Sequence, residues 1–287
     1  KKTKKIVVLA TGGTIAGLAS DASKPQNYTA GQVGVVDLLR GVVHEGIELL
    51  TEQVAQIDSK DMSFAVWQSL LARVVHWLEQ DDVQGVVITH GTDTLEETAY
   101  FLQAVLQPTK PVAMTCAMLP ANAPDSDGPG NLKDALDWVQ QPAASGVSGV
   151  SVVCAGQVHA GNAVQKSHSH QRNPFTSQTG VAYPAALRVP SVAQVLACTH
   201  WPHVELVFNH AGADGRLVRA LMAHDAPQGW VVAGTGNGTL HHDLEAALLD
   251  AQKQGTQVLR ASRCAQGGVQ SREADLLPHA GGLTAVQ

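Results

Sequence analysis

The chain has 287 residues, enough for two domains and for a sizeable core without disulfide or metal support. Hydrophobic residues make up 44% and charged residues 15%, which is typical of globular proteins, and no apolar run is long enough to span a bilayer. The formal net charge is -6, and the one basic cluster, Lys1, Lys2, Lys4 and Lys5, lies at the terminus. Composition therefore argues against nucleic-acid and membrane partners.

Apolar runs rich in β-branched residues predict buried strands. They lie at 6–10, 83–89, 111–119, 149–154, 204–208, 230–233 and 256–259. The helical rhythm of apolar residues between them predicts helices at 61–80, 94–106, 131–139 and 240–251, with Asn131 as a candidate cap. Strands that alternate with helices predict an α/β fold with a mostly parallel, doubly wound sheet.

Residues 156–203 interrupt this alternation with several Pro, Gly, Ser and His residues. We place an irregular segment and the domain linker there. The expected organisation is a larger N-terminal domain over 1–195, the end of the linker at 196–203, and a smaller α/β domain over 204–287.

Neither the cysteines nor the histidines indicate a metal site. The cysteines are far apart and form no C-x-x-C pair; Cys116 and Cys154 lie in strand-like runs and are expected to be buried hydrophobes. Among 13 histidines, the neighbouring pairs lack an H-E-x-x-H arrangement or an accompanying cysteine pair, so no metal is predicted. These pairs are His168 and His170, His200 and His203, and His241 and His242.

Three turns that follow predicted strands are candidates for binding or catalysis, because ligands of open parallel sheets gather at the carboxyl ends of the strands. They are Thr11-Gly-Gly-Thr14, His90-Gly-Thr-Asp-Thr94 and Gly234-Thr-Gly-Asn-Gly238. The first lacks both the lysine of a P-loop and the glycine spacing of a dinucleotide turn. The third is closer to a dinucleotide turn, although a plain tight turn explains it more simply.

The second turn combines hydroxyls with a carboxylate. Thr94 fits a helix N-cap, with Glu97 completing a capping box, but that interpretation leaves Asp93 unexplained. Thr92 and Thr14 would supply two hydroxyls to one crevice, whereas Thr11 would only support its turn. A hydroxyl becomes a useful nucleophile beside a base or a positive charge, and Lys166 is the candidate for that role.

Several motifs occur together and in a fixed order along nearly the whole chain. They are ATGGTIAG at 10–17, DSKDM at 58–62, ITHGTDTLEETAYFL at 88–102, NHAGADG at 209–215 and GTGNG at 234–238. Together they resemble the motifs of bacterial L-asparaginases of the asparaginase/glutaminase family, which includes the type II enzymes.

The resemblance implies hydrolysis of L-asparagine to L-aspartate and ammonia, without a cofactor, through a covalent acyl-enzyme. Thr14 is then the nucleophile, and Tyr28, on a mobile loop, lies beside its hydroxyl. Thr92, Asp93 and Lys166 form a second catalytic group, in which Lys166 favours ionisation of Thr92 or of an attacking water. Backbone N–H groups near Thr14 and Thr92 would hold the oxyanion.

The resemblance also implies a site for the charged groups of the amino acid. Asp93, next to Thr92, would face the α-ammonium of the substrate, and Ser59 would hold its α-carboxylate. Lys60 stands where many type II members have Gln, and as a substrate-binding cation it would either tighten binding of the α-carboxylate or alter the tolerance for glutamine. Thr239 stands where related enzymes often have Asn or Ser. Glutamine is therefore expected to be at most a minor substrate.

The family implies a homotetramer built as a dimer of intimate dimers. Glu273 is the nearest match to a glutamate that reaches into the site of the neighbouring subunit. No leader-like segment follows the terminal lysines, so we expect a cytoplasmic protein, with export to the periplasm as the alternative. Two other functions remain open: an asparaginase-like subunit of a tRNA-dependent amidotransferase, and a non-catalytic protein that binds an amino acid or a dinucleotide through Gly234–Gly238.

Overall fold

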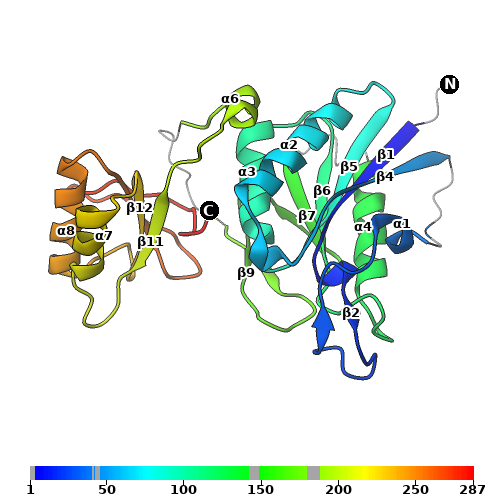
Figure 1. The fold of residues 1–287 in the computed structure, drawn as a ribbon, viewed down its shortest axis with the longest axis horizontal. Coiled ribbons are helices and arrows are strands. Elements are labelled where there is room, and N and C mark those ends of the chain that lie inside the picture. The colour runs from blue at the N-terminus through cyan, green and yellow to red at the C-terminus, as the bar shows by residue number, and fades with distance from the viewer. Residues whose placement is uncertain (1–3, 41, 43–45, 142–148, 180–187) are drawn as a thin grey trace. The chain divides into compact units, whose positions relative to one another are not determined.

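The computed structural model describes residues 4–40, 42, 46–141, 149–179 and 188–287, so Lys1 and Lys2 of the basic cluster lie outside it. The chain forms two compact units. The larger comprises Lys1–Ser177 and Val189–Ala197; the smaller comprises Gln178–Arg188 and Cys198–Gln287. Both combine helices with a sheet, mostly parallel in the larger unit and parallel in the smaller, which confirms the predicted two-domain α/β class (Figure 1). No helix in the described ranges is both long and apolar enough to cross a membrane.

The larger unit is built on a six-stranded sheet with the strand order β4-β1-β5-β6-β7-β8. Its strands are β1 (Lys4–Gly12), β4 (Ile47–Ile57), β5 (Val83–Thr89), β6 (Val112–Thr115), β7 (Val150–Cys154) and β8 (Gln157–Ala160). All neighbours pair in parallel except β8, which is antiparallel to β7. From β1 the chain goes to β4 on one side and then returns to β5 on the other. The carboxyl ends of β1 and β5 thus form the switch point at which open α/β sheets bind ligands.

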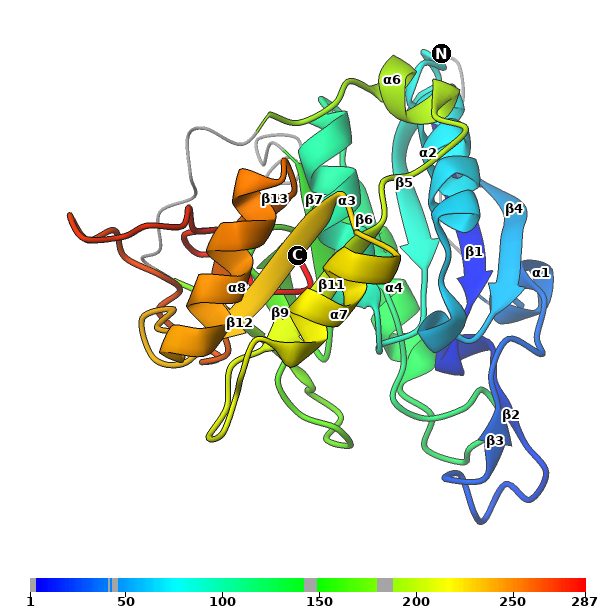
Figure 2. The ribbon, with the colours of Figure 1, turned by 60° about the vertical axis from the view of Figure 1, so that its left-hand side comes forward.

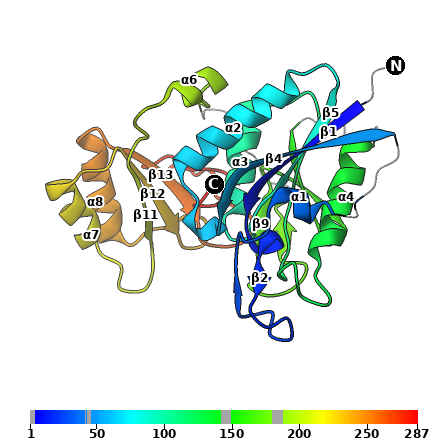
Figure 3. The same cartoon turned by 45° about the vertical axis from the view of Figure 1, so that its right-hand side comes forward.

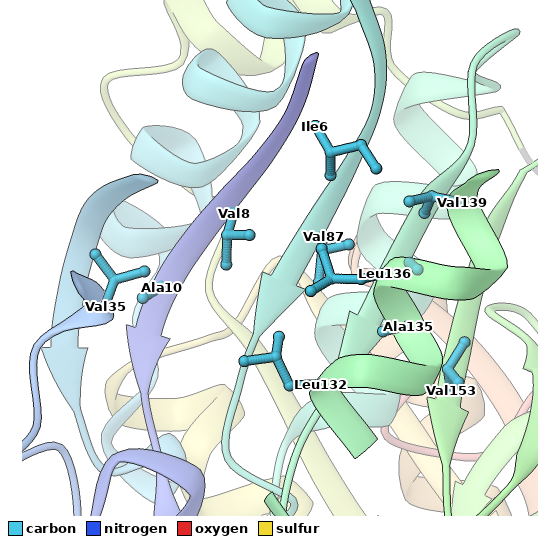
Figure 4. Packing of buried hydrophobic residues seen from close by; sticks show 11 residues of the cluster. Ile6, Val8, Ala10, Val35, Val87, Leu132, Ala135, Leu136, Val139 and Val153 are labelled. Carbon is cyan, nitrogen blue, oxygen red and sulfur yellow. The ribbon is translucent and has the colours of Figure 1, made fainter. Parts of the chain in front are cut away.

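Helices cover both faces of this sheet. On one face, α1 (Val35–Leu38) and α4 (Gly128–Gln140) pack against alternate residues of β1, as Figure 4 shows. On the other face, α2 (Phe64–Leu78) and α3 (Leu95–Leu106) pack together; Figure 3 shows α2 and α4 on opposite sides of β1 and β5. Because β1 is covered on both faces, its residues from Ile6 to Leu9 are all fully buried, which accounts for its continuous apolar run.

The smaller unit has three parallel strands, β11 (Val204–Phe208), β12 (Gly229–Gly234) and β13 (Gln257–Ser262). Helices α7 (Arg216–His224) and α8 (His242–Lys253) pack on it around the buried Trp230. The glycine-rich turn after β12 closes on itself, because Thr235 and Thr239 exchange backbone hydrogen bonds of 2.9 and 2.8 Å. This geometry is that of a tight turn.

The sequence prediction missed the elements with few buried residues. Strand β4 lies at the edge of the sheet, and none of its 11 residues is fully buried. Helix α7 buries only Val218. The segment predicted to be irregular contains the strands β8, β9 (Val164–Lys166) and β10 (Phe175–Ser177), followed by α6 (Val192–Ala197). Short or half-exposed elements lack the periodicity on which such predictions depend.

Of two predicted helix starts, the one at Asn131 is wrong, and the one at Thr94 is correct in position but lacks the expected hydrogen bond. Helix α4 begins at Gly128 rather than at Asn131, which lies inside it, 4% exposed. The Asn131 amide donates to the Cys116 carbonyl at 2.9 Å, and its oxygen accepts from the Ala155 N–H at 3.0 Å. Asn131 therefore joins neighbouring strand ends instead of capping a helix. Thr94 does lie at the start of α3, but its side chain makes no capping hydrogen bond.

Candidate active site

Two backbone turns meet at the switch point. After β1, Gly12 and Gly13 have φ angles of 108° and 82°, a region that favours glycine. A Cβ atom on Gly13 would lie 2.3 Å from the Gly91 nitrogen, so the two turns touch backbone to backbone. Thr11 ties them together, since its hydroxyl donates to the Thr89 carbonyl at 2.9 Å. Gly13 is needed for this close approach, whereas Gly12 makes room for the backbone of β4.

The first turn positions Thr14. It begins the short 3-10 helix η1 (Thr14–Ala16) and is 7% exposed. Its hydroxyl lies 2.7 Å from the Tyr28 hydroxyl. Tyr28 belongs to β3 (Tyr28–Thr29), which forms a small hairpin with β2 (Leu18–Ala19). The structure therefore brings together the predicted nucleophile and its predicted neighbour.

The second turn meets a lysine from a distant strand. Lys166, the last residue of β9, donates through Nζ to Thr92 Oγ1 at 2.8 Å and to Asp93 Oδ1 at 2.6 Å. The Lys166 side chain is only 15% exposed, whereas that of Asp93 is 55% exposed. A partly desolvated cation beside a hydroxyl favours its ionised form. Asp93 keeps an exposed carboxylate that can accept from an ammonium group.

Glu96 holds the backbone of the lysine. Its Oε2 accepts from the Lys166 N–H at 2.6 Å, which joins the first turn of α3 to β9. Burial raises the pKa of Glu96, while the hydrogen bond and the nearby ammonium oppose that effect. This contact was not predicted, because nothing in the local sequence relates Glu96 to a strand 70 positions away.

Both turns also present backbone N–H groups. Among the hydrogen bonds of the described residues, the N–H groups of Thr14 and Thr92 have no protein acceptor, and the two residues are 7% and 5% exposed. Two such donors at one switch point are suited to an oxyanion.

Ser59 lies against the second turn. It begins the 3-10 helix η2 (Ser59–Asp61) after β4 and is 3% exposed. Its hydroxyl accepts from the Asp93 N–H at 3.2 Å, and its carbonyl accepts from the Thr94 hydroxyl at 2.8 Å. Thr94 thus holds Ser59 in place, and the predicted capping box with Glu97 does not form.

Lys60 is held by its neighbours in the sequence. Its Nζ lies 2.9 Å from Asp58 Oδ2 and 3.0 Å from Asp61 Oδ2, and its side chain is 61% exposed. Hydrogen bonds to these two carboxylates raise the pKa of Lys60. The cation therefore has protein partners of its own beside Ser59.

A buried hydrogen-bonded chain supports Gly91, and the sequence analysis missed it. Trp67 donates to the Thr98 hydroxyl at 2.9 Å, Thr98 lies 2.9 Å from His90 Nε2, and His90 Nδ1 lies 2.7 Å from the Gly91 carbonyl. Burial lowers the pKa of His90 to about 4, so the ring is neutral at pH 7. Because a carbonyl can only accept, the ring proton is on Nδ1 and Nε2 accepts from Thr98.

Glu273 lies in the smaller unit, exposed in the turn that Arg272 and Asp275 close. Its predicted role at a subunit interface stays a prediction. His241, His242 and Asp243, at the start of α8, bring their ligand atoms within 4.8 Å of one another. His242 and Asp243 are exposed, and the expectation that the chain holds no metal also stays a prediction.

The fold and the two turns define a two-unit α/β protein with a hydroxyl and lysine site at the switch point of its larger sheet. Residues 5–190 match the family model described as asparaginase, N-terminal, and residues 203–285 match that of the glutaminase/asparaginase C-terminal domain. The chain belongs to the asparaginase family.

Relatives support this assignment. A glutaminase-asparaginase of Pseudomonas fluorescens biotype A is 34% identical, with 96% of this chain and 79% of that protein covered. L-asparaginase 2 of Escherichia coli (strain K12) is 37% identical, with 94% and 81% covered. The solved structure of a probable cytoplasmic L-asparaginase from Campylobacter jejuni superimposes with a TM-score of 0.88 at 29% identity, covering 99% of this chain and 92% of that one.

Proposed function

We propose that the protein is an L-asparaginase, which hydrolyses the side-chain amide of L-asparagine to L-aspartate and ammonia through an ester on Thr14. One observation carries the proposal: Lys166 contacts Thr92 and Asp93 at the turn whose backbone touches the Thr14 turn. Neither the amidotransferase subunit nor the binding protein accounts for that arrangement together with the family membership.

Acylation begins at Thr14. Its oxygen attacks the amide carbon, and its proton leaves through the Tyr28 hydroxyl, 2.7 Å away, toward the departing nitrogen. The Thr14 and Thr92 N–H groups stabilise the oxyanion, and such donors are typically worth about 10²–10³ in rate. Breakage of the C–N bond releases ammonia and leaves the aspartyl ester.

Hydrolysis of the ester uses the second catalytic group, which contains Thr92 and Lys166. A water molecule attacks the ester carbon, and Thr92, whose ionised form Lys166 favours, takes a proton from it. The C–O bond to Thr14 breaks, the proton returns to Thr14, and L-aspartate is released. No cofactor is required by this sequence of steps.

Substrate charges match the site. The exposed carboxylate of Asp93 accepts from the α-ammonium, and Ser59 with neighbouring N–H donors holds the α-carboxylate. The charge of Lys60 is offset by Asp58 and Asp61, so Lys60 does not bind the α-carboxylate directly. Glutamine, longer by one methylene, is a minor substrate.

The decisive experiment is ammonia release from L-asparagine and, separately, from L-glutamine. Thr14→Ala should lose nearly all turnover, whereas Thr11→Ser, at the neighbouring supporting hydroxyl, should retain it. The Thr92→Val variant should be impaired in deacylation. If a species about 115 Da heavier than the free protein accumulates in this variant, the mass is that of one aspartyl ester, and the intermediate is covalent. Full turnover by Thr14→Ala would exclude the proposed nucleophile.

Assembly and location complete the proposal. The active form is a homotetramer, a dimer of intimate dimers, in which Glu273 serves the site of a neighbouring subunit. Light scattering measures the mass, and mixing inactive Glu273→Gln with inactive Thr14→Ala subunits should restore activity if sites are shared. We propose a cytoplasmic location, as in the description of the C. jejuni protein; cell fractionation tests it against the periplasm.

A further inference from the structure

We propose that Asn122 is a positioning residue: its carboxamide clamps the backbone of Ala19 and thereby holds the hairpin β2–β3 with Tyr28 against Thr14. The inference rests on the proposed function only for its kinetic consequence. The clamp itself is a structural claim that can be tested without activity.

The hairpin carries Tyr28 on one of its two short strands. Ala19 pairs directly with Tyr28, and Leu18 pairs with Thr29. The Tyr28 hydroxyl then meets the Thr14 hydroxyl at 2.7 Å. Because Ala19 and Tyr28 are register partners, a contact that fixes the backbone of Ala19 also fixes the backbone from which the Tyr28 ring extends.

Asn122 makes such a contact with both of its polar atoms. Its Oδ1 accepts from the Ala19 N–H at 2.8 Å, and its Nδ2 donates to the Ala19 carbonyl at 2.8 Å. The preceding Ala121 N–H donates to the Gly17 carbonyl at 2.9 Å. The segment 121–122 therefore acts toward β2 as a third strand would. A carboxamide suits this role because it carries a donor and an acceptor side by side.

The tip of the hairpin has no comparable support. For residues 20–27, the hydrogen bonds lie within the segment itself: Ser23 and Lys24 bond to Asp21, and Asn27 bonds to Lys24. In Figure 2 the hairpin projects past the end of β1, away from the sheet. A two-stranded hairpin is at best marginally stable alone. Contacts at its base therefore decide where Tyr28 lies.

The base of the clamp is itself well held. The Asp127 carboxylate accepts from the Met118 N–H and the Leu119 N–H, each at 2.9 Å. The Ala123 N–H donates to the Pro120 carbonyl at 3.0 Å. Asp127 lies directly before α4, so the loop that carries Asn122 is anchored between β6 and the start of that helix. The clamp therefore fixes the position of the hairpin relative to β6 and α4.

Hydrogen exchange tests the clamp directly. In Asn122→Ala, amides in a peptide covering 17–29 should exchange about tenfold faster, since two hydrogen bonds at the hairpin base are lost. Asn122→Asp keeps the acceptor for the Ala19 N–H but not the donor, and should give the same direction of change. Asn27→Ala, in the hairpin tip, is the matched control and should leave β2 unchanged. Wild-type exchange in Asn122→Ala would overturn the clamp.

Kinetic measurements test whether the clamp positions Tyr28 for catalysis. Asn122→Ala should lower kcat on L-asparagine about tenfold in the wild-type background and by less than about twofold in the Tyr28→Phe background, because the clamp acts through the Tyr28 hydroxyl. Equal losses in both backgrounds would overturn a positioning role. If the wild-type protein releases no ammonia at all, the proposed function fails, and the exchange experiment still decides whether Asn122 holds the hairpin.

Discussion

Lys166 Nζ lies 2.8 Å from Thr92 Oγ1, although the two residues are 74 positions apart. In the proposed mechanism, this contact makes the lysine the charge that activates the second hydroxyl. Lys166→Met, which keeps the length of the side chain without its charge, should lower kcat on L-asparagine by about 10²–10⁴, the range of an acid or base group. The measurement is steady-state ammonia release. Lys133→Met, at an exposed lysine paired with Asp137, should turn over normally; an undiminished rate in Lys166→Met would remove the lysine from the mechanism.

The close approach of the two turns predicts the effect of a single methyl group. Gly13→Ala would place Cβ 2.3 Å from the Gly91 nitrogen at a backbone φ of 82°. The turns must separate, which misplaces both backbone donors, so we expect kcat to fall by about 10² or more. Gly130→Ala, with nothing within 4 Å of the added carbon and a position inside α4, should be fully active and slightly more stable. Crystals of Gly13→Ala with an unchanged turn would contradict the steric argument.

His90 makes stability depend on pH on the acid side. Its pKa is about 4 in the fold because of burial, below the ordinary value of 6.5, so the unfolded chain binds the proton more readily. The contribution of neutral His90 to the free energy of unfolding is fully present above pH 6.5. It is lost as pH falls toward 4, and it amounts to about 3 kcal/mol in all. Urea unfolding at several pH values measures it. His90→Gln should flatten this slope, and His224→Gln, at an exposed position, should keep it.

Glu97 makes stability depend on pH in the opposite direction. Burial, with a smaller effect of Glu96, raises its pKa to about 7, above the ordinary value of 4.5. The folded state therefore holds this proton more firmly, and the associated stability, present below pH 4.5, is lost as pH rises through 7. Glu97→Gln should stabilise the protein at pH 8 by about 1 kcal/mol, a value reduced for its partial exposure, and not at pH 4.5.

Thermal unfolding at the two pH values compares Glu97→Gln with Glu79→Gln, an exposed position at the end of α2. The exposed variant should follow the wild type at both pH values. Equal stabilisation by Glu97→Gln at pH 4.5 and pH 8 would show that its effect has another cause.

Elements with one continuous buried side were predictable from local sequence. The apolar rhythm at 94–106 corresponds to α3 within one residue, and the run at 83–89 is β5. Strand β4 was missed because it is an edge strand with a half-exposed, polar pattern. Strand β9 was missed because three residues carry no periodicity, although it delivers Lys166.

The residues proposed for the candidate site could be named from the sequence, but their supporting contacts could not. Thr14 and Thr92 stand out by residue type and by motif, and Lys166 by residue type and by the family resemblance. Glu96 and Asn122 do not, because their partners lie 70 and 103 positions away and their importance comes from geometry alone.

By itself, the sequence determined the α/β class, the positions of the two threonine turns at strand ends, and the family resemblance. These depend on local pattern, in which hydrophobic periodicity and glycine report the backbone directly. Only the tertiary structure decided that Lys166 meets Thr92, that Gly13 touches Gly91, and that Asn122 clamps Ala19. Such contacts depend on strand order and register, which bring distant residues together without any trace in the local sequence.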